Sequence, residues 1–211
     1  MRDFIDPLLV MILALNLFAL GTSRIQSAIR IVAAQGILLG LTTLLMHEKA
    51  SLPVILSAAA AVAIKGIVIP AVMIRSLRSA GIKREVEPFI GFLPSIVLGA
   101  AATGAVLLLS RALGATGMAS LVVPASISTA LVGFILLIGR YKAISQVLGY
   151  LVLENGIYLF GTLLVEAIPL VVEMGMLLDL FVGVFVISII ANHINRAFSS
   201  TDTRRLVSLK D

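Results

Sequence analysis

The stretch that decides the fold runs from residue 144 to residue 165 and reads ISQVLGYLVLENGIYLFGTLLV. It has the length that a helix needs to cross the hydrocarbon of a membrane, about 20 residues, and it carries Glu154 near its centre. A second apolar run, residues 170–191, carries Asp179 at a similar depth. A carboxylate at that depth costs roughly 2.5–3.5 kcal/mol on insertion scales, so it seldom faces lipid and usually marks an ion or proton path. Both acids are therefore candidates for function.

The composition of the whole chain is that of an integral membrane protein. Its 211 residues are 60% hydrophobic and 13% charged, which leaves too little polar surface for a water-soluble domain. The net charge of +5 does not indicate nucleic-acid binding, because the basic residues lie in short connections between apolar runs. The sequence contains no cysteine, so this chain supplies no thiolate for an iron–sulfur cluster or another metal.

Runs of about 20 apolar residues predict seven transmembrane spans. They lie near residues 4–21, 25–46, 53–74, 89–109, 120–139, 144–166 and 169–191. All should be helices, because a spanning segment must satisfy its own backbone hydrogen bonds. Pro70 and Pro94 fall inside two of these spans, where the missing N–H predicts a kink. The predicted fold class is thus an all-α polytopic membrane protein.

The basic residues of the connections predict the orientation. One set of connections and the tail contain Arg24, Arg30, Arg75, Arg78, Lys83, Arg84, Arg140, Lys142, Arg196, Arg204, Arg205 and Lys210. The opposite set contains only Arg2, Lys49 and Arg111. Cytoplasmic connections carry an excess of Lys and Arg, so we expect the N-terminus outside and the C-terminus in the cytoplasm.

The order of the spans suggests a parallel repeat of two three-helix units joined by the fourth span. The turn Gly-Thr-Ser-Arg at 21–24 corresponds to Gly-Arg-Tyr-Lys at 139–142, and the segment that begins Gln35-Gly-Ile corresponds to the one that begins Asn155-Gly-Ile. Chance similarity among Leu-, Ala- and Ile-rich helices is an equal alternative to duplication. The predicted organisation is a first unit 1–78, a cytoplasmic loop with the connecting span 79–117, a second unit 118–199 and a cytoplasmic tail 200–211.

Glu154 belongs to a polar stripe along one helix. Gln146, Tyr150, Glu154 and Tyr158 follow one another at intervals of four residues, which makes a line about 18 Å long. Such a stripe can carry protons, or it can supply hydrogen bonds to a neighbouring helix. We favour a proton-path role for Glu154 and helix contacts for the tyrosines, and we keep Gln146, Tyr150 and Tyr158 as accessory candidates for the path.

Lys65 lies near the middle of the third predicted span, too deep to extend its ammonium group to the interface. It is either the partner of a buried carboxylate, Glu154 or Asp179, or a proton relay. We favour a proton-path role for Asp179, and a structural ion pair with Lys65 is the alternative. Glu173, about one turn inside the seventh span, is a further accessory candidate.

The remaining mid-span and interfacial polar residues have simpler interpretations. Asn16 and Gln35 are mid-span amides, which most often hydrogen-bond to neighbouring helices. His47 and His193 stand alone without the spacing of metal ligands, so we predict no metal site in this chain.

The last two spans resemble the small three-helix K subunit of respiratory complex I and the related subunit of multisubunit cation/proton antiporters. The resemblance rests on Gly-Tyr-Leu-Val-Leu-Glu-Asn-Gly at 149–156 and on Asp-Leu-Phe-Val-Gly at 179–183. In that family the last two helices each carry a membrane-embedded glutamate on the proton path. The resemblance implies this role for Glu154 and, with aspartate in place of glutamate, for Asp179.

Over its full length the chain resembles the hydrogenase-4 component E family, the membrane-arm subunits of formate hydrogenlyase-type, group 4 NiFe-hydrogenases. The segments at 149–157 and 179–186 carry this resemblance. It implies a non-catalytic subunit in a prokaryotic cytoplasmic (inner) membrane, with antiporter-like and other membrane subunits and peripheral hydrogenase subunits as partners. The NiFe centre and the iron–sulfur clusters are expected in those partners.

The function that follows is a contribution of Lys65, Glu154 and Asp179 to a lateral row of protonatable groups within the lipid bilayer. Electron transfer elsewhere in the complex would drive protons, or Na⁺, along that row. A free-standing secondary transporter and a structural scaffold without a transport role are the alternatives.

Overall fold

Six helices in the described part of the chain are long and apolar enough to cross a membrane. The computed structural model describes residues 2–46, 52–79, 88–114 and 119–163. In chain order the helices are α1 (Arg2–Gly21), α2 (Ile25–Met46), α3 (Leu52–Ala60), η1 (Ala61–Val68), α4 (Ile69–Ser79), α5 (Phe92–Ala112), α6 (Ala119–Gly139) and α7 (Ala143–Gly161). The all-helical prediction and the first six spans are confirmed, and the seventh, 169–191, lies outside the described residues.

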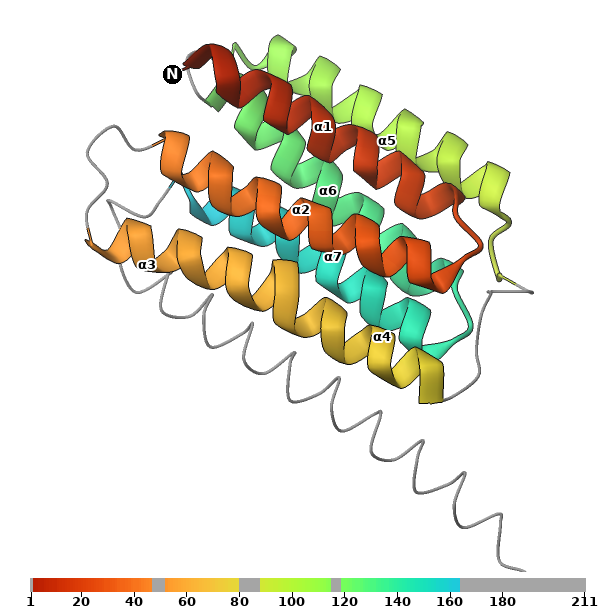
Figure 1. Cartoon of the computed structure of the whole chain (residues 1–211). Coiled ribbons are helices and arrows are strands. Elements are labelled where there is room, and N and C mark those ends of the chain that lie inside the picture. The colour runs from red at the N-terminus through yellow and green to blue at the C-terminus, as the bar shows by residue number, and fades with distance from the viewer. Residues whose placement is uncertain (1, 47–51, 80–87, 115–118, 164–211) are drawn as a thin grey trace, which may run out of the picture.

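Helix α2 occupies the middle of the arrangement (Figure 1). It packs against α1, against α7 and against the continuous third span formed by α3, η1 and α4. Helix α6 packs against α1, α5 and α7. Helix α5 lies at one edge beside α1, and the third span lies at the opposite edge (Figure 1). Few residues of α5 are buried by the other described helices.

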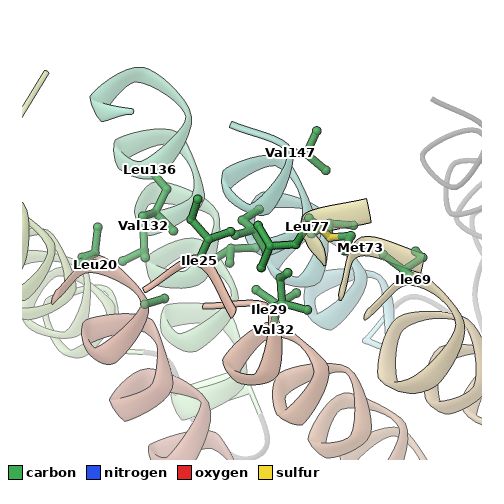
Figure 2. Close-up of a cluster of buried hydrophobic side chains, with 14 residues drawn as sticks. Leu20, Ile25, Ile29, Val32, Ile69, Met73, Leu77, Val132, Leu136 and Val147 are labelled. Atoms are coloured by element: carbon green, nitrogen blue, oxygen red, sulfur yellow. The ribbon is translucent and has the colours of Figure 1, made fainter. Parts of the chain in front are cut away.

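Buried apolar side chains from five helices meet near one end of the bundle (Figure 2). The labelled members are Leu20, Ile25, Ile29, Val32, Ile69, Met73, Leu77, Val132, Leu136 and Val147. Close packing of this kind is what holds membrane helices together, since lipid tails are as apolar as the side chains. The cluster gathers the helix ends that the basic residues predict to be cytoplasmic. The orientation itself remains a prediction.

Glycines bring α6 and α7 into backbone contact. A Cβ on Gly149 would lie 2.5 Å from the backbone nitrogen of Leu137, and a Cβ on Gly156 would lie 2.5 Å from that of Ala130. Gly133 meets the backbone of Leu153 in the same way. Small residues let membrane helices approach closely enough for dispersion contacts along the backbone, so these three glycines fix the α6–α7 pair.

The two prolines for which the sequence predicts a kink, Pro70 and Pro94, have different surroundings. The prediction of a kink at Pro94 is wrong, because α5 begins at Phe92 and Pro94 stands in its first turn, where the backbone N–H has no helical partner to lose. Before Pro70 the third span widens into the π-helix η1, in which Ile69 N–H donates to the carbonyl of Ile64, five residues earlier. Proline supplies no N–H for a regular α-helical turn, and π-helical hydrogen bonding precedes it here. A kink at Pro70 stays a prediction.

We expect Gly156→Ala to destabilise the α6–α7 contact by about 1–3 kcal/mol, because the added methyl group meets backbone that cannot rotate away. Gly104→Ala is the matched control. A Cβ on Gly104 meets nothing within 4 Å, so this change should be neutral or stabilising by up to about 1 kcal/mol through helix propensity. Unfolding of the two purified variants in mild detergent measures the difference. Equal stability of the two variants would contradict the proposed close contact.

Candidate functional site: a buried ion pair

Lys65 and Glu154 form an ion pair inside the bundle. Lys65 Nζ lies 3.3 Å from Glu154 Oε1, and the two side chains are 3% and 4% exposed. Lys65 comes from η1 and Glu154 from α7, so the pair joins the third span to the sixth. Of the two acids that the sequence offered as partners of Lys65, the structure brings Glu154 to it. Asp179 and Glu173 lie outside the described residues.

The local sequence explains how a lysine reaches this depth. A Cβ on Gly36 of α2 would lie 2.8 Å from Lys65 Cβ, and a Cβ on Gly40 would lie 2.9 Å from the carbonyl oxygen of Ala58. Without side chains at these two positions, the third span lies directly on α2. Lys65 also stands within the π-helical turns of η1, and π-helical segments are frequent at functional sites.

Tyr158 forms another side of the site. Its ring centroid lies 5.1 Å from Lys65 Nζ, and its hydroxyl oxygen lies 3.3 Å from the hydroxyl oxygen of Thr43 on α2. The Thr43 hydroxyl also donates to the carbonyl of Leu39 at 2.9 Å. Lys65 therefore has a carboxylate and an aromatic face as neighbours, and both come from α7.

The members of the polar stripe of α7 have different surroundings. Gln146 is exposed, and its Nε2 donates to the carbonyl of Arg140 at 3.1 Å. Tyr150 is half-buried and packs against the hydrophobic cluster of Figure 2. Glu154 and Tyr158, the two members nearer the end of α7, both contact Lys65. The structure thus separates Gln146 from the ion pair.

Four buried polar residues form a second system, the amide chain, beside the ion pair. Asn155 Nδ2 donates to Gln35 Oε1 at 3.4 Å, and Gln35 Nε2 donates to Asn16 Oδ1 at 2.7 Å. Asn16 Nδ2 donates to Thr129 Oγ1 at 2.8 Å, and Thr129 Oγ1 donates to the carbonyl of Ala125 at 2.7 Å. The donors all run in one direction from α7 through α2 and α1 to α6, an arrangement in which hydrogen bonds polarise one another.

The sequence predicted part of this system. Asn16 and Gln35 were expected to contact neighbouring helices, which the amide chain confirms. Asn155 and Thr129 were not singled out, although an amide directly after a buried glutamate lies at the same depth and was the available signal. Arg140, a basic residue of a predicted cytoplasmic connection, is buried and donates to the carbonyls of Leu20 at 2.7 Å and Ile90 at 2.9 Å.

The chemistry available at the site is proton exchange. A carboxylate and an amine can each gain or lose a proton, and no third acid or histidine joins them into a metal site among the residues that the structure describes. Two opposite charges at 3.3 Å stabilise each other where water does not reach, whereas one charge alone carries the full desolvation cost.

We expect Lys65→Met to lower the free energy of unfolding by about 3–5 kcal/mol, because it leaves the Glu154 carboxylate buried beside a thioether. The double variant Lys65→Met/Glu154→Gln should recover most of that loss, since neither charge remains. Denaturation of the purified chain in detergent measures both. Arg30→Met, which removes an exposed cation from α2, is the control and should change stability by less than about 0.5 kcal/mol. A double variant no more stable than Lys65→Met would refute the coupling.

Comparison with known proteins supports a membrane protein related in part to a hydrogenase component. The chain is 28% identical over 191 residues to an uncharacterised protein of Mycobacterium tuberculosis, a match that covers 89% of this chain and 87% of that protein. It is 31% identical over 80 residues to hydrogenase-4 component E of Escherichia coli, which covers 38% of this chain and 37% of that protein. Component E of Shigella flexneri gives the same identity and coverage.

No protein-family model matches the chain, and no solved structure gives a significant match. The chain is accordingly described by its architecture, a multi-pass α-helical membrane protein, and by partial similarity to a component of hydrogenase-4.

Proposed function

We propose that this chain is a non-catalytic membrane-arm subunit of a complex I-like, membrane-bound hydrogenase. In this proposal it contributes protonatable groups to a lateral proton path, or Na⁺ path, that is coupled to electron transfer. The observation that carries the proposal is the Lys65–Glu154 pair, 3.3 Å apart and almost fully buried. The partial similarity to hydrogenase-4 component E supports the choice of complex.

A buried lysine–glutamate pair has the properties that a relay needs. A proton can move from Lys65 Nζ to the Glu154 carboxylate, which converts two charges into two neutral groups without changing the net charge of the site. The balance between the two forms depends on nearby charge, because interactions inside a low-dielectric bundle are weakly screened. A charge that arrives on a neighbouring group or subunit can therefore shift the proton. Asp179 belongs to the proposal through its sequence position, as the next group along the path.

The redox chemistry belongs to partner subunits in this proposal. The chain has no cysteine to hold the iron–sulfur clusters or the NiFe centre, which are expected in peripheral hydrogenase subunits. Antiporter-like membrane subunits would continue the row of protonatable groups. The location is a prokaryotic cytoplasmic (inner) membrane.

A structural scaffold is the second candidate function, because the ion pair and the amide chain also fasten helices to one another. The amide chain alone links four helices. Replacing the acids by amides distinguishes a proton path from a scaffold. Glutamine and asparagine keep the shape and the hydrogen bonds of the acids, but they do not gain and lose a proton near neutral pH.

Affinity purification of the tagged chain from its native membranes tests the assembly. We expect a nickel-containing large subunit, an iron–sulfur subunit and antiporter-like subunits to purify with it. If the chain purifies alone and catalyses ion or solute flux in liposomes, the subunit proposal is wrong and the free-standing transporter is right.

We expect Glu154→Gln and Asp179→Asn to leave the complex assembled and to reduce proton translocation per electron, with the larger loss for Glu154→Gln. The glutamine keeps an acceptor oxygen beside Lys65, so its cost in stability should be smaller than that of Lys65→Met. The pH gradient formed by vesicles that contain the complex, divided by its electron-transfer rate, measures the effect. Asp6→Asn, at an exposed carboxylate, is the control. Normal translocation in both amide variants would favour the scaffold.

A further inference from the structure

Tyr158 presents the face of its ring to the same ammonium group that Glu154 binds. Lys65 Nζ lies 5.1 Å from the ring centroid, within the distance of about 6 Å at which a cation is attracted to an aromatic face. Tyr158 follows Glu154 by four residues, so the two side chains leave α7 one helical turn apart on one face. A single helix thus offers Lys65 both a carboxylate and an aromatic surface.

The hydroxyl of Tyr158 is engaged elsewhere. Its oxygen lies 3.3 Å from the Thr43 hydroxyl oxygen. The Thr43 hydroxyl donates to this oxygen and also to the carbonyl of Leu39, at 2.9 Å. The hydroxyl oxygen of Tyr158 therefore lies at α2, while the face of the ring lies toward Lys65.

We propose that Tyr158 is a positioning residue that holds the ammonium group of Lys65 against Glu154 through the face of its ring, and that its hydroxyl is not a step of the proton path. The attraction between a cation and an aromatic ring is greatest where both are removed from water, as Lys65 is here. The consequence for proton movement rests on the proposed function, whereas the ring contact can be tested without it.

A double-mutant cycle on the purified chain tests the ring contact. Tyr158→Leu should shift the unfolding equilibrium toward the unfolded state about tenfold more when Lys65 is present than in the Lys65→Met background. Tyr158→Phe keeps the ring and loses only the hydroxyl contact with Thr43. In the Thr43→Val background, where that contact is already absent, Tyr158→Phe should change the unfolding equilibrium by less than about twofold. Equal effects of Tyr158→Leu in the two backgrounds would overturn the assignment.

Proton translocation by the assembled complex tests the consequence. Tyr158→Phe should translocate nearly as many protons per electron as the original chain, and Tyr158→Leu should lose about as much as Lys65→Met. Phe160→Leu removes an exposed ring from the same helix and is the matched control, expected to be unchanged. A loss in Tyr158→Phe equal to that in Tyr158→Leu would make the hydroxyl a relay and overturn the proposal.

The two proposals fail in different ways. Normal translocation in Glu154→Gln and Lys65→Met would refute the proposed function, and the stability cycle would still decide whether Tyr158 positions Lys65. Impaired Glu154→Gln together with a fully active Tyr158→Leu would keep the proposed function and refute the positioning role.

Discussion

Lys65 and Glu154 can stay buried as charges only while the two remain in contact, because either charge alone carries a desolvation cost that apolar packing does not offset. Their separation of 3.3 Å therefore fixes how the third span sits against α7. Gly36 of α2 allows the ion pair to form, because a larger residue at this position would collide with the backbone of Lys65. The Lys65–Glu154 contact and the absence of a side chain at Gly36 thus act together to constrain the third span, α2 and α7.

The ion pair and the amide chain begin from consecutive residues. On α7, Glu154 faces Lys65 and Asn155 begins the amide chain. On α2, Lys65 packs directly on Gly36, and Gln35 continues the amide chain. Successive residues on a helix point about 100° apart, so α2 and α7 can each serve two neighbours at one depth. The described spans other than α5 are connected in this way, which gives the middle of the bundle a fixed geometry despite the weak directional preference of apolar packing.

Hydropathy sufficed to place the spans, and α1 and α6 end where expected, because both end at glycines in polar turns. Helix α7 ends at Gly161, before the expected end at residue 166. Depth along each span was also readable, so Lys65 and Glu154 could be recognised as potential partners. The choice between Glu154 and Asp179 could not be made, since it depends on which helices are neighbours. The π-helical turns of η1 and the displaced start of α5, which moves Pro94 into a first turn, depend on backbone hydrogen bonding that composition does not encode.

The arrangement at the centre bears on the suggested repeat. The suggested repeat puts Gln35 and Asn155 in corresponding places of its two units, and these two residues are hydrogen-bonded to each other at 3.4 Å. Corresponding residues of two related units meet only near the axis that relates them, so a duplication would place its axis beside this contact. The charges do not follow that symmetry, because the counterpart of Glu154 in the first unit is Ala34. In the suggested repeat, Lys65 belongs to the first unit and Glu154 to the second, so the proposed proton exchange would cross from one unit to the other. Function at this site would then depend on the asymmetry that arose after duplication, which is why the internal similarity alone did not identify the pair.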